Sequence, residues 1–212
     1  MLVALDFDGT LSDSEMTVLL GEQVGVATEM ATITEQAMND ELPYAASLRR
    51  RCTLLAGLDL DTARDALGAV TLRPGTRGVL DGLRTAGAET AILTGGFERG
   101  VERALAEAGT GVDTVVANRL LATDGTLTGE VTGPLVEGTK DDALTILQAA
   151  TGETETVAVG DGANDRPMLA AADLAVGFAP KPAVEPVCDV VVDSMTELRA
   201  VFESKGVLPE QP

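Results

Sequence analysis

The chain has 212 residues, of which 45% are hydrophobic, and it carries a formal net charge of −19 with no histidine. This length suits one core of ordinary size with an insertion. The negative charge argues against nucleic acid or an anionic membrane as a partner, because both require basic patches. No apolar run is long enough to span a membrane, and no leader pattern precedes the first acids. We therefore expect a cytoplasmic protein.

Twelve of the fifteen basic residues are arginines. Together with the excess of acids, this composition indicates a protein of a high-salt organism, in which salt screens the repulsion between surface carboxylates. An ordinary acidic protein is the alternative. We expect the melting temperature to rise between low and molar KCl, and a constant melting temperature over that range would contradict the hypothesis.

Residues 2–5 form a short apolar run that predicts a buried parallel strand. Four helices are then expected near 15–24, 29–39, 44–56 and 61–69, with Ser12 or Ser14 as the N-cap of the first. After Pro74 helices alternate with short apolar strands, which is typical of a doubly wound parallel sheet. The expected strands are 90–93, 114–117, 156–159, 174–176 and 190–192; the expected helices are 76–86, 97–108, 139–151, 164–171 and 196–204; and residues 120–131 form a β-hairpin that turns at Asp124-Gly125.

This pattern predicts an α/β fold with two parts. A doubly wound parallel-sheet core comprises residues 1–14 and 71–212, and a small helical cap of residues 15–70 is inserted after the first strand. Ligands of such sheets bind outside the carboxyl ends of the strands. Because the insertion leaves the core at that edge, we expect it to act as a lid over a ligand site.

Four segments place reactive groups at or after predicted strand ends. Asp6 and Asp8 follow the first strand, and their like charges favour a hard divalent cation with oxygen ligands. Thr94–Gly96 is expected to be a glycine turn that points a hydroxyl and backbone amides at an anion. Lys140 begins a helix, and Gly160–Asp165 is a glycine-rich acidic loop. Each segment alone could be a surface turn or a capping group, but their joint placement predicts one ligand site.

In this order, the four segments resemble the motifs of the haloacid dehalogenase superfamily of phosphatases, which use an aspartate nucleophile and have a Rossmann-like core. The resemblance implies that Asp6 attacks phosphorus and forms an aspartyl-phosphate. It implies that Asp8 protonates the leaving alcohol and later deprotonates the attacking water. The Asp6 side chain, the Asp8 backbone carbonyl and Asp161 would hold Mg²⁺.

The same resemblance assigns the remaining polar residues of these segments. The phosphoryl oxygens would be held by Thr94, the Gly95 amide and Lys140. Asp165 would orient Lys140 or a metal-bound water, and Asn164 would reach toward the phosphate or the substrate.

Within the superfamily, several further segments are similar to the phosphoserine phosphatases. These segments are Glu15, Ile33–Met38, Ser47–Arg51, Asn118–Leu120 and Asp124–Gly129. The similarity implies Mg²⁺-dependent hydrolysis of O-phosphoserine, the last step of serine biosynthesis. The substrate ammonium would then bind Glu15, and its carboxylate would bind Arg51, whose planar fork suits a carboxylate. Met38 and Tyr44 would form an apolar wall, although Tyr44 replaces the usual Phe of that family.

Other readings of the sequence remain open. The phosphomonoester could instead be phosphoglycolate or a sugar phosphate, and only Glu15 and Arg51 argue against this. An alcohol such as homoserine could replace water as the phosphate acceptor. A receiver-like signalling domain without catalysis also uses an acidic pocket, a Thr and a Lys, but it has no lid insertion. A monomer and a homodimer are equally compatible with the sequence.

Overall fold

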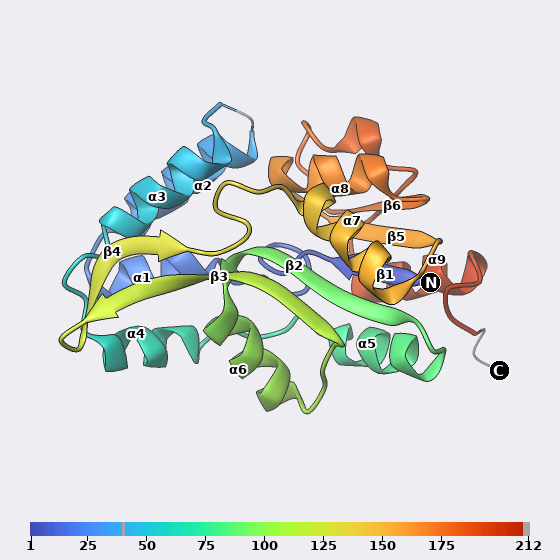
Figure 1. Cartoon of the computed structure of the whole chain (residues 1–212), viewed down its shortest axis with the longest axis horizontal. Helices are drawn as coiled ribbons and strands as arrows, with labels where there is room; N and C mark the ends of the chain where they lie inside the picture. Colours follow the sequence, from blue (N-terminus) through green and yellow to red (C-terminus); the bar gives the residue numbers. More distant parts are fainter. Residues whose placement is uncertain (40, 210–212) are drawn as a thin grey trace.

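The computed structural model describes residues 1–39 and 41–209 of the chain. These residues form a seven-stranded sheet with the order β4-β3-β2-β1-β5-β6-β7 (Figure 1). Neighbouring strands run parallel except β3 and β4, which form an antiparallel hairpin. The strands are β1 (Leu2–Leu5), β2 (Glu89–Phe97), β3 (Thr114–Thr123), β4 (Thr126–Thr132), β5 (Thr156–Gly160), β6 (Leu174–Phe178) and β7 (Val190–Val192). The predicted doubly wound α/β fold is therefore confirmed.

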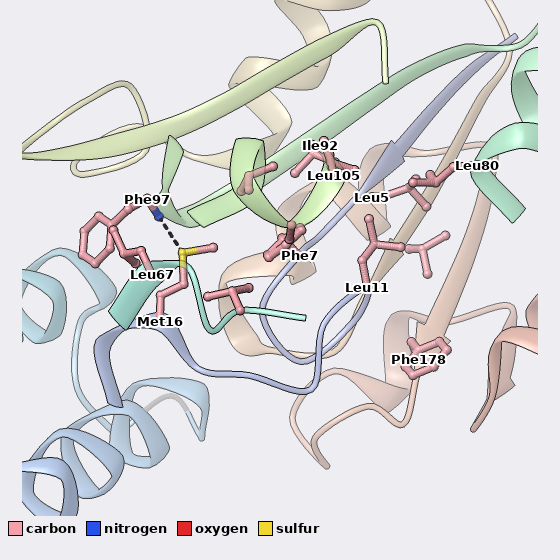
Figure 2. Packing of buried hydrophobic residues seen from close by; sticks show 14 of the residues in the cluster. Leu5, Phe7, Leu11, Met16, Leu67, Leu80, Ile92, Phe97, Leu105 and Phe178 are labelled. Carbon is pink, nitrogen blue, oxygen red and sulfur yellow. Dashed lines mark hydrogen bonds between the residues drawn. The ribbon is translucent and has the colours of Figure 1, made fainter. Parts of the chain in front are cut away.

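The central strand β1 is buried on both faces, as its continuous apolar sequence requires. Side chains alternate across a strand, so Val3 and Leu5 enter one hydrophobic cluster and Leu2 and Ala4 enter another. Figure 2 shows Leu5 within the larger cluster. Helices α5 (Thr76–Thr85), α6 (Glu98–Ala108) and α9 (Met195–Ser204) contribute to that cluster, and α7 (Lys140–Thr151) and α8 (Arg166–Ala171) cover the other face.

Four helices stand between β1 and β2 in the chain: α1 (Met16–Gln23), α2 (Ala27–Met38), α3 (Tyr44–Thr53) and α4 (Leu60–Leu67). They pack on one another, and α2 and α3 lie above the β3–β4 hairpin in Figure 1. No helix of the described part of the chain combines the length and the apolar character needed to cross a membrane.

Backbone contacts hold the insertion to the rest of the molecule at its base and at its far end. Where the chain leaves and returns, Ser12 forms an isolated antiparallel bridge with Leu72. At the far end, the amide of Gly57 donates to the carbonyl of Leu127 and the amide of Leu127 donates to the carbonyl of Leu58, both at 2.8 Å. The β3–β4 hairpin is therefore hydrogen-bonded to the segment that joins α3 to α4.

Two local expectations are wrong. The N-cap of α1 is Glu15, without a side-chain capping bond, because the Ser12 hydroxyl instead donates to the carbonyl of Thr71 at 2.7 Å. The predicted turn at Thr94–Gly96 is part of β2, which stays extended as far as Phe97. The pairing of β2 with β3 is irregular between Leu93 and Phe97, so the glycines are accommodated by a bulge.

Candidate active site

The two acids that follow β1 are placed by a short turn at the centre of the sheet. The amide of Asp6 donates to the carbonyl of Val159 at 2.9 Å, which extends the β1–β5 pairing by one residue. The chain then turns back, because the amides of Thr10 and Ser12 both donate to the carbonyl of Phe7. This turn lies where β1 meets β5 and the strand order reverses, which is the usual ligand site of such sheets.

Gly9 lets this turn approach the loop after β5. Its φ of 89° lies in the left-handed region, and a Cβ at this position would lie 2.6 Å from Oδ2 of Asp161. The Thr10 hydroxyl also donates to Oδ1 of Asp161 at 3.4 Å. The loops after β1 and β5 therefore meet at Asp161.

Lys140 links the acids of these two loops. It is the first residue of α7, and only 2% of it is exposed. Its ammonium contacts both Asp6 and Asp165, which are themselves buried. The other oxygen of Asp165 accepts the amides of Asp161 and Gly162, each at 2.9 Å. Because both of its oxygens are engaged, Asp165 fixes the position of Lys140 relative to the loop.

The end of β2 brings a hydroxyl and two glycines to the same place. Thr94 is buried, and its hydroxyl oxygen accepts the amide of Gly96 at 2.9 Å. The carbonyl of Gly95 accepts the side-chain amide of Asn118, which is fully buried in β3, at 3.0 Å. These contacts hold the segment extended while Thr94 and Gly95 line the site.

Burial raises the pKa values of the central acids. Burial, followed by repulsion from Asp165, raises the pKa of Asp6 to about 7. Burial and the negative charges of Glu15 and Asp6 raise the pKa of Asp8 well above its usual range. Burial disfavours the Lys140 ammonium, but the carboxylates of Asp165 and Asp6 outweigh this effect and raise its pKa. The site therefore gathers more carboxylates than the Lys140 ammonium can neutralise.

The acids of the site fit a divalent metal ion. One carboxylate oxygen from each of Asp6, Asp161 and Asp165 lies within 4.8 Å of the others. Burial, followed by the charges of Asp6 and Asp165, raises the pKa of Asp161 well above its usual range. Hard divalent cations prefer oxygen ligands of this kind, and such a cation would relieve the repulsion among these acids.

The insertion contributes a buried guanidinium, that of Arg51, to a second wall of the cavity that the acids after β1 line. Arg51 of α3 is 3% exposed, and its Nη1 donates to the hydroxyls of Thr17 and Thr34, each at 3.0 Å. Its Nε and Nη2 are buried and have no hydrogen-bond partner among residues 1–39 and 41–209. These two nitrogens share one edge of the planar group and donate in parallel, which suits both oxygens of a carboxylate.

Glu15 lies on the same wall, just before α1. Burial raises its pKa, and the positive charges of Arg51 and Lys181 oppose that increase. An acid and a guanidinium that face one cavity form a pair of opposite charges suited to a zwitterion.

One cavity of about 30 Å³ joins the two walls, which is room for one or two water molecules. It is lined by Asp6, Asp8, Glu15, Thr17, Met38, Tyr44, Arg51, Thr94, Gly95, Gly96, Asp161 and Asn164. Of the predicted site residues, only Lys140 and Asp165 do not line it, and they join the site through the contact of Lys140 with Asp6. The structure therefore brings every predicted site residue together.

Tyr44 closes one side of this cavity. Its hydroxyl lies so near Gly95 that a Cβ there would be 1.7 Å from it, so only glycine allows this approach. Burial raises the pKa of Tyr44 to about 12, and the phenol therefore stays protonated at neutral pH. The centroid of its ring also lies 5.9 Å from the Arg51 guanidinium carbon.

Several supporting residues were not singled out from the sequence. The amide of Phe97 donates to the sulfur of Met16 at 3.2 Å (Figure 2), so a fully buried residue of the insertion holds the end of β2. Thr17 and Thr34 orient Arg51. Helical spacing alone gives no signal that these hydroxyls face an arginine on another helix.

The family model of haloacid dehalogenase-like hydrolases matches residues 3–170. The chain therefore belongs to this family, which confirms the resemblance seen in its four motifs. Among curated relatives, it is 51% identical over 208 residues to the phosphoserine phosphatase of Halobacterium salinarum, covering 97% of this chain and 99% of that protein. It is 38% identical over 188 residues to the phosphoserine phosphatase of Streptococcus thermophilus, covering 86% of each.

Solved structures show the same likeness. A phospho-aspartyl intermediate analogue of phosphoserine phosphatase matches with a TM-score of 0.89 and 33% identity, covering 96% of this chain and 97% of that one. A substrate-bound phosphoserine phosphatase complex also has a TM-score of 0.89, with 32% identity and the same coverage. The predicted similarity to phosphoserine phosphatases, and with it the class of phosphoric monoester hydrolase, is confirmed.

Proposed function

We propose that this chain hydrolyses O-phosphoserine to serine and phosphate through an aspartyl-phosphate. The observation that carries the proposal is the single cavity that joins Asp6 and Asp8 to Glu15 and Arg51. One wall suits a phosphoryl group, and the other suits an ammonium and a carboxylate. The curated relatives named phosphoserine phosphatase support the same substrate.

In the first step, a carboxylate oxygen of Asp6 forms a bond to phosphorus while the bond from phosphorus to the serine oxygen breaks. Asp8 gives its proton to that leaving oxygen, so serine departs as the alcohol. Burial and the negative charges of Glu15 and Asp6 raise the pKa of Asp8, which favours the protonated side chain that this step needs. Water then attacks the aspartyl-phosphate, Asp8 takes a proton from it, and phosphate leaves Asp6 as a free carboxylate.

Lys140, the Thr94 hydroxyl and the Gly95 amide would hold the phosphoryl oxygens, and Asp165 would keep Lys140 in place. The Asp6 side chain, the Asp8 backbone carbonyl and Asp161 would hold Mg²⁺. When bound, the ion neutralises the charge between carboxylate and phosphate.

On the substrate side, Arg51 would bind the carboxylate with its free edge, and Glu15 would bind the ammonium. Met38, Tyr44 and Asn164 would form the remaining wall. We also propose that residues 15–70 act as a cap, because Glu15, Met38, Tyr44 and Arg51 of this insertion line the same cavity as the acids that follow β1. A cytoplasmic role in serine biosynthesis is part of this proposal.

A substrate panel tests the proposal. With Mg²⁺, phosphoserine should give a kcat/KM at least about tenfold above those of phosphoglycolate and sugar phosphates, because only phosphoserine satisfies both Glu15 and Arg51. Activity should be lost in EDTA and restored by Mg²⁺. Equal turnover of phosphoserine and phosphoglycolate would contradict the zwitterion site. In a reaction of phosphoserine to which homoserine is added, formation of phosphohomoserine in place of free phosphate would indicate a phosphotransferase.

Metal binding should also stabilise the fold in a pH-dependent way. Without metal, the pKa of Asp6 near 7 lies above its value in the unfolded chain, so the stability linked to its proton is lost as the pH rises through about 7. Mg²⁺ should offset this loss, because it binds the deprotonated carboxylate of Asp6. We expect Mg²⁺ to raise the melting temperature more at about pH 8 than at about pH 6. An increase that is equal at both values would contradict this linkage.

A further inference from the structure

Arg73 bonds to the turn that follows β1. It lies on the segment by which the chain returns from the insertion to the core, and its side chain is partly buried. Its Nη2 donates to the carbonyl of Gly9 at 3.0 Å, and its backbone amide donates to the carbonyl of Leu11 at 2.8 Å. One residue of the returning segment therefore holds two carbonyls of this turn.

The guanidinium of Arg73 is fixed from another direction by β6. Its central carbon lies 5.2 Å from the ring centroid of Phe178, a buried residue at the end of β6. Its Nε is buried and has no hydrogen-bond partner in the described part of the chain. A buried donor without a partner is unfavourable, so the contacts of Nη2 and of the guanidinium face must hold the side chain in this position.

Gly9, whose carbonyl Arg73 holds, is also confined by Asp161 and Ser12. Gly9 has a φ of 89°, and a Cβ on it would lie 2.6 Å from the carboxylate of Asp161. Its amide donates to the carbonyl of Ser12 at 2.9 Å. With its carbonyl held by Arg73, Gly9 has little freedom to rotate. The Asp8 carbonyl belongs to the same planar peptide as the Gly9 amide. Only φ and ψ of Gly9 separate this plane from the next peptide, whose carbonyl Arg73 holds. These contacts therefore restrict the direction of the Asp8 carbonyl.

We propose that Arg73 is a positioning residue of the metal site. By holding the Gly9 carbonyl, it would keep the neighbouring Asp8 carbonyl in one orientation. This inference rests on the proposed function, in which the Asp8 carbonyl is a metal ligand. Arg73 does not line the substrate cavity, and its effect should therefore fall on metal binding rather than on phosphoserine binding.

Calorimetric titration of Mg²⁺ into the whole protein without substrate tests this inference. Arg73→Ala should raise the Kd for Mg²⁺ roughly 10- to 100-fold, the usual cost of losing a residue that supports a metal ligand. The KM for phosphoserine at saturating Mg²⁺ should stay within about twofold of the wild type. Added guanidinium should recover part of the lost affinity in this variant. Arg73→Lys, which can still donate one bond but lacks the planar group, should lie between wild type and Arg73→Ala.

Matched variants separate the outcomes. Arg77→Ala removes an exposed arginine of α5, paired only with Asp81 among the described residues, and should leave the Kd for Mg²⁺ unchanged. Asp161→Asn should abolish measurable Mg²⁺ binding. If Asp161→Asn binds Mg²⁺ normally, the proposed metal site itself is wrong. If Asp161→Asn fails to bind Mg²⁺ while Arg73→Ala and Arg73→Lys bind it like the wild type, the proposed role of Arg73 is overturned. This conclusion holds even if Arg73→Ala has a lower melting temperature, because a loss of stability alone would show only a structural role.

Discussion

The Asp6→Asn variant is expected to lose phosphoserine hydrolysis by about three orders of magnitude or more while it remains folded. An amide is nearly the same size as the carboxylate but cannot form the acyl phosphate, so the covalent route is closed. The fold should survive because Lys140 keeps its contact with Asp165 and the core around β1 is unchanged. Phosphate release measures the loss, and circular dichroism with a melting curve checks the fold.

Two comparisons sharpen this experiment. Asp13→Asn removes an exposed acid a few residues further along the same segment and should retain full activity. Beryllium fluoride, which mimics a phosphoryl group on a carboxylate, should bind the wild type in the presence of Mg²⁺ and should not bind Asp6→Asn. Near wild-type turnover by Asp6→Asn would refute the nucleophile assignment, whatever the fluoride result.

The parts of this site that could be predicted lie on single stretches of chain next to strand ends. An apolar run followed by acids identifies β1 and Asp6 without knowledge of the rest, because a buried parallel strand and its ligand-side loop are local in sequence. Lys140 is predictable in the same way, since a lone lysine at a helix start stands out in a chain with only three lysines. Their meeting in space follows from the sheet order.

The parts that could not be predicted depend on contacts between distant segments. The glycines after Thr94 suggested a turn, yet β2 stays extended there because Asn118 of β3 bonds to Gly95 and Met16 of the insertion bonds to the amide of Phe97. Arg73 has no local feature that distinguishes it from a surface arginine beside a proline. Its partners come from the turn after β1 and from the end of β6. Such roles arise from tertiary packing and leave no periodic pattern.

The Arg51→Met variant should separate phosphoserine from substrates that lack a carboxylate. Methionine fills much of the same space without a charge, so a carboxylate in the cavity would lose its partner. Loss of a buried charge pair costs about 2–5 kcal/mol, which corresponds to roughly a 30- to 4,000-fold fall in kcat/KM for phosphoserine. An aryl phosphate such as 4-nitrophenyl phosphate should change by no more than about threefold, since Asp6, Lys140 and Thr94 are untouched.

The neighbouring arginine of the same helix provides the control. Arg50 is exposed and lies 3.7 Å from Glu29 on α2, so Arg50→Met removes the same charge from α3 without opening the cavity. It should leave both substrates unaffected, because exposed pairs contribute little. Arg51→Lys keeps the charge but loses the parallel Nε and Nη2 donors, and we expect it to recover only part of the selectivity. Equal losses on phosphoserine and on the aryl phosphate in Arg51→Met would mean that the buried guanidinium supports the packing of Thr17 and Thr34 and does not recognise the substrate.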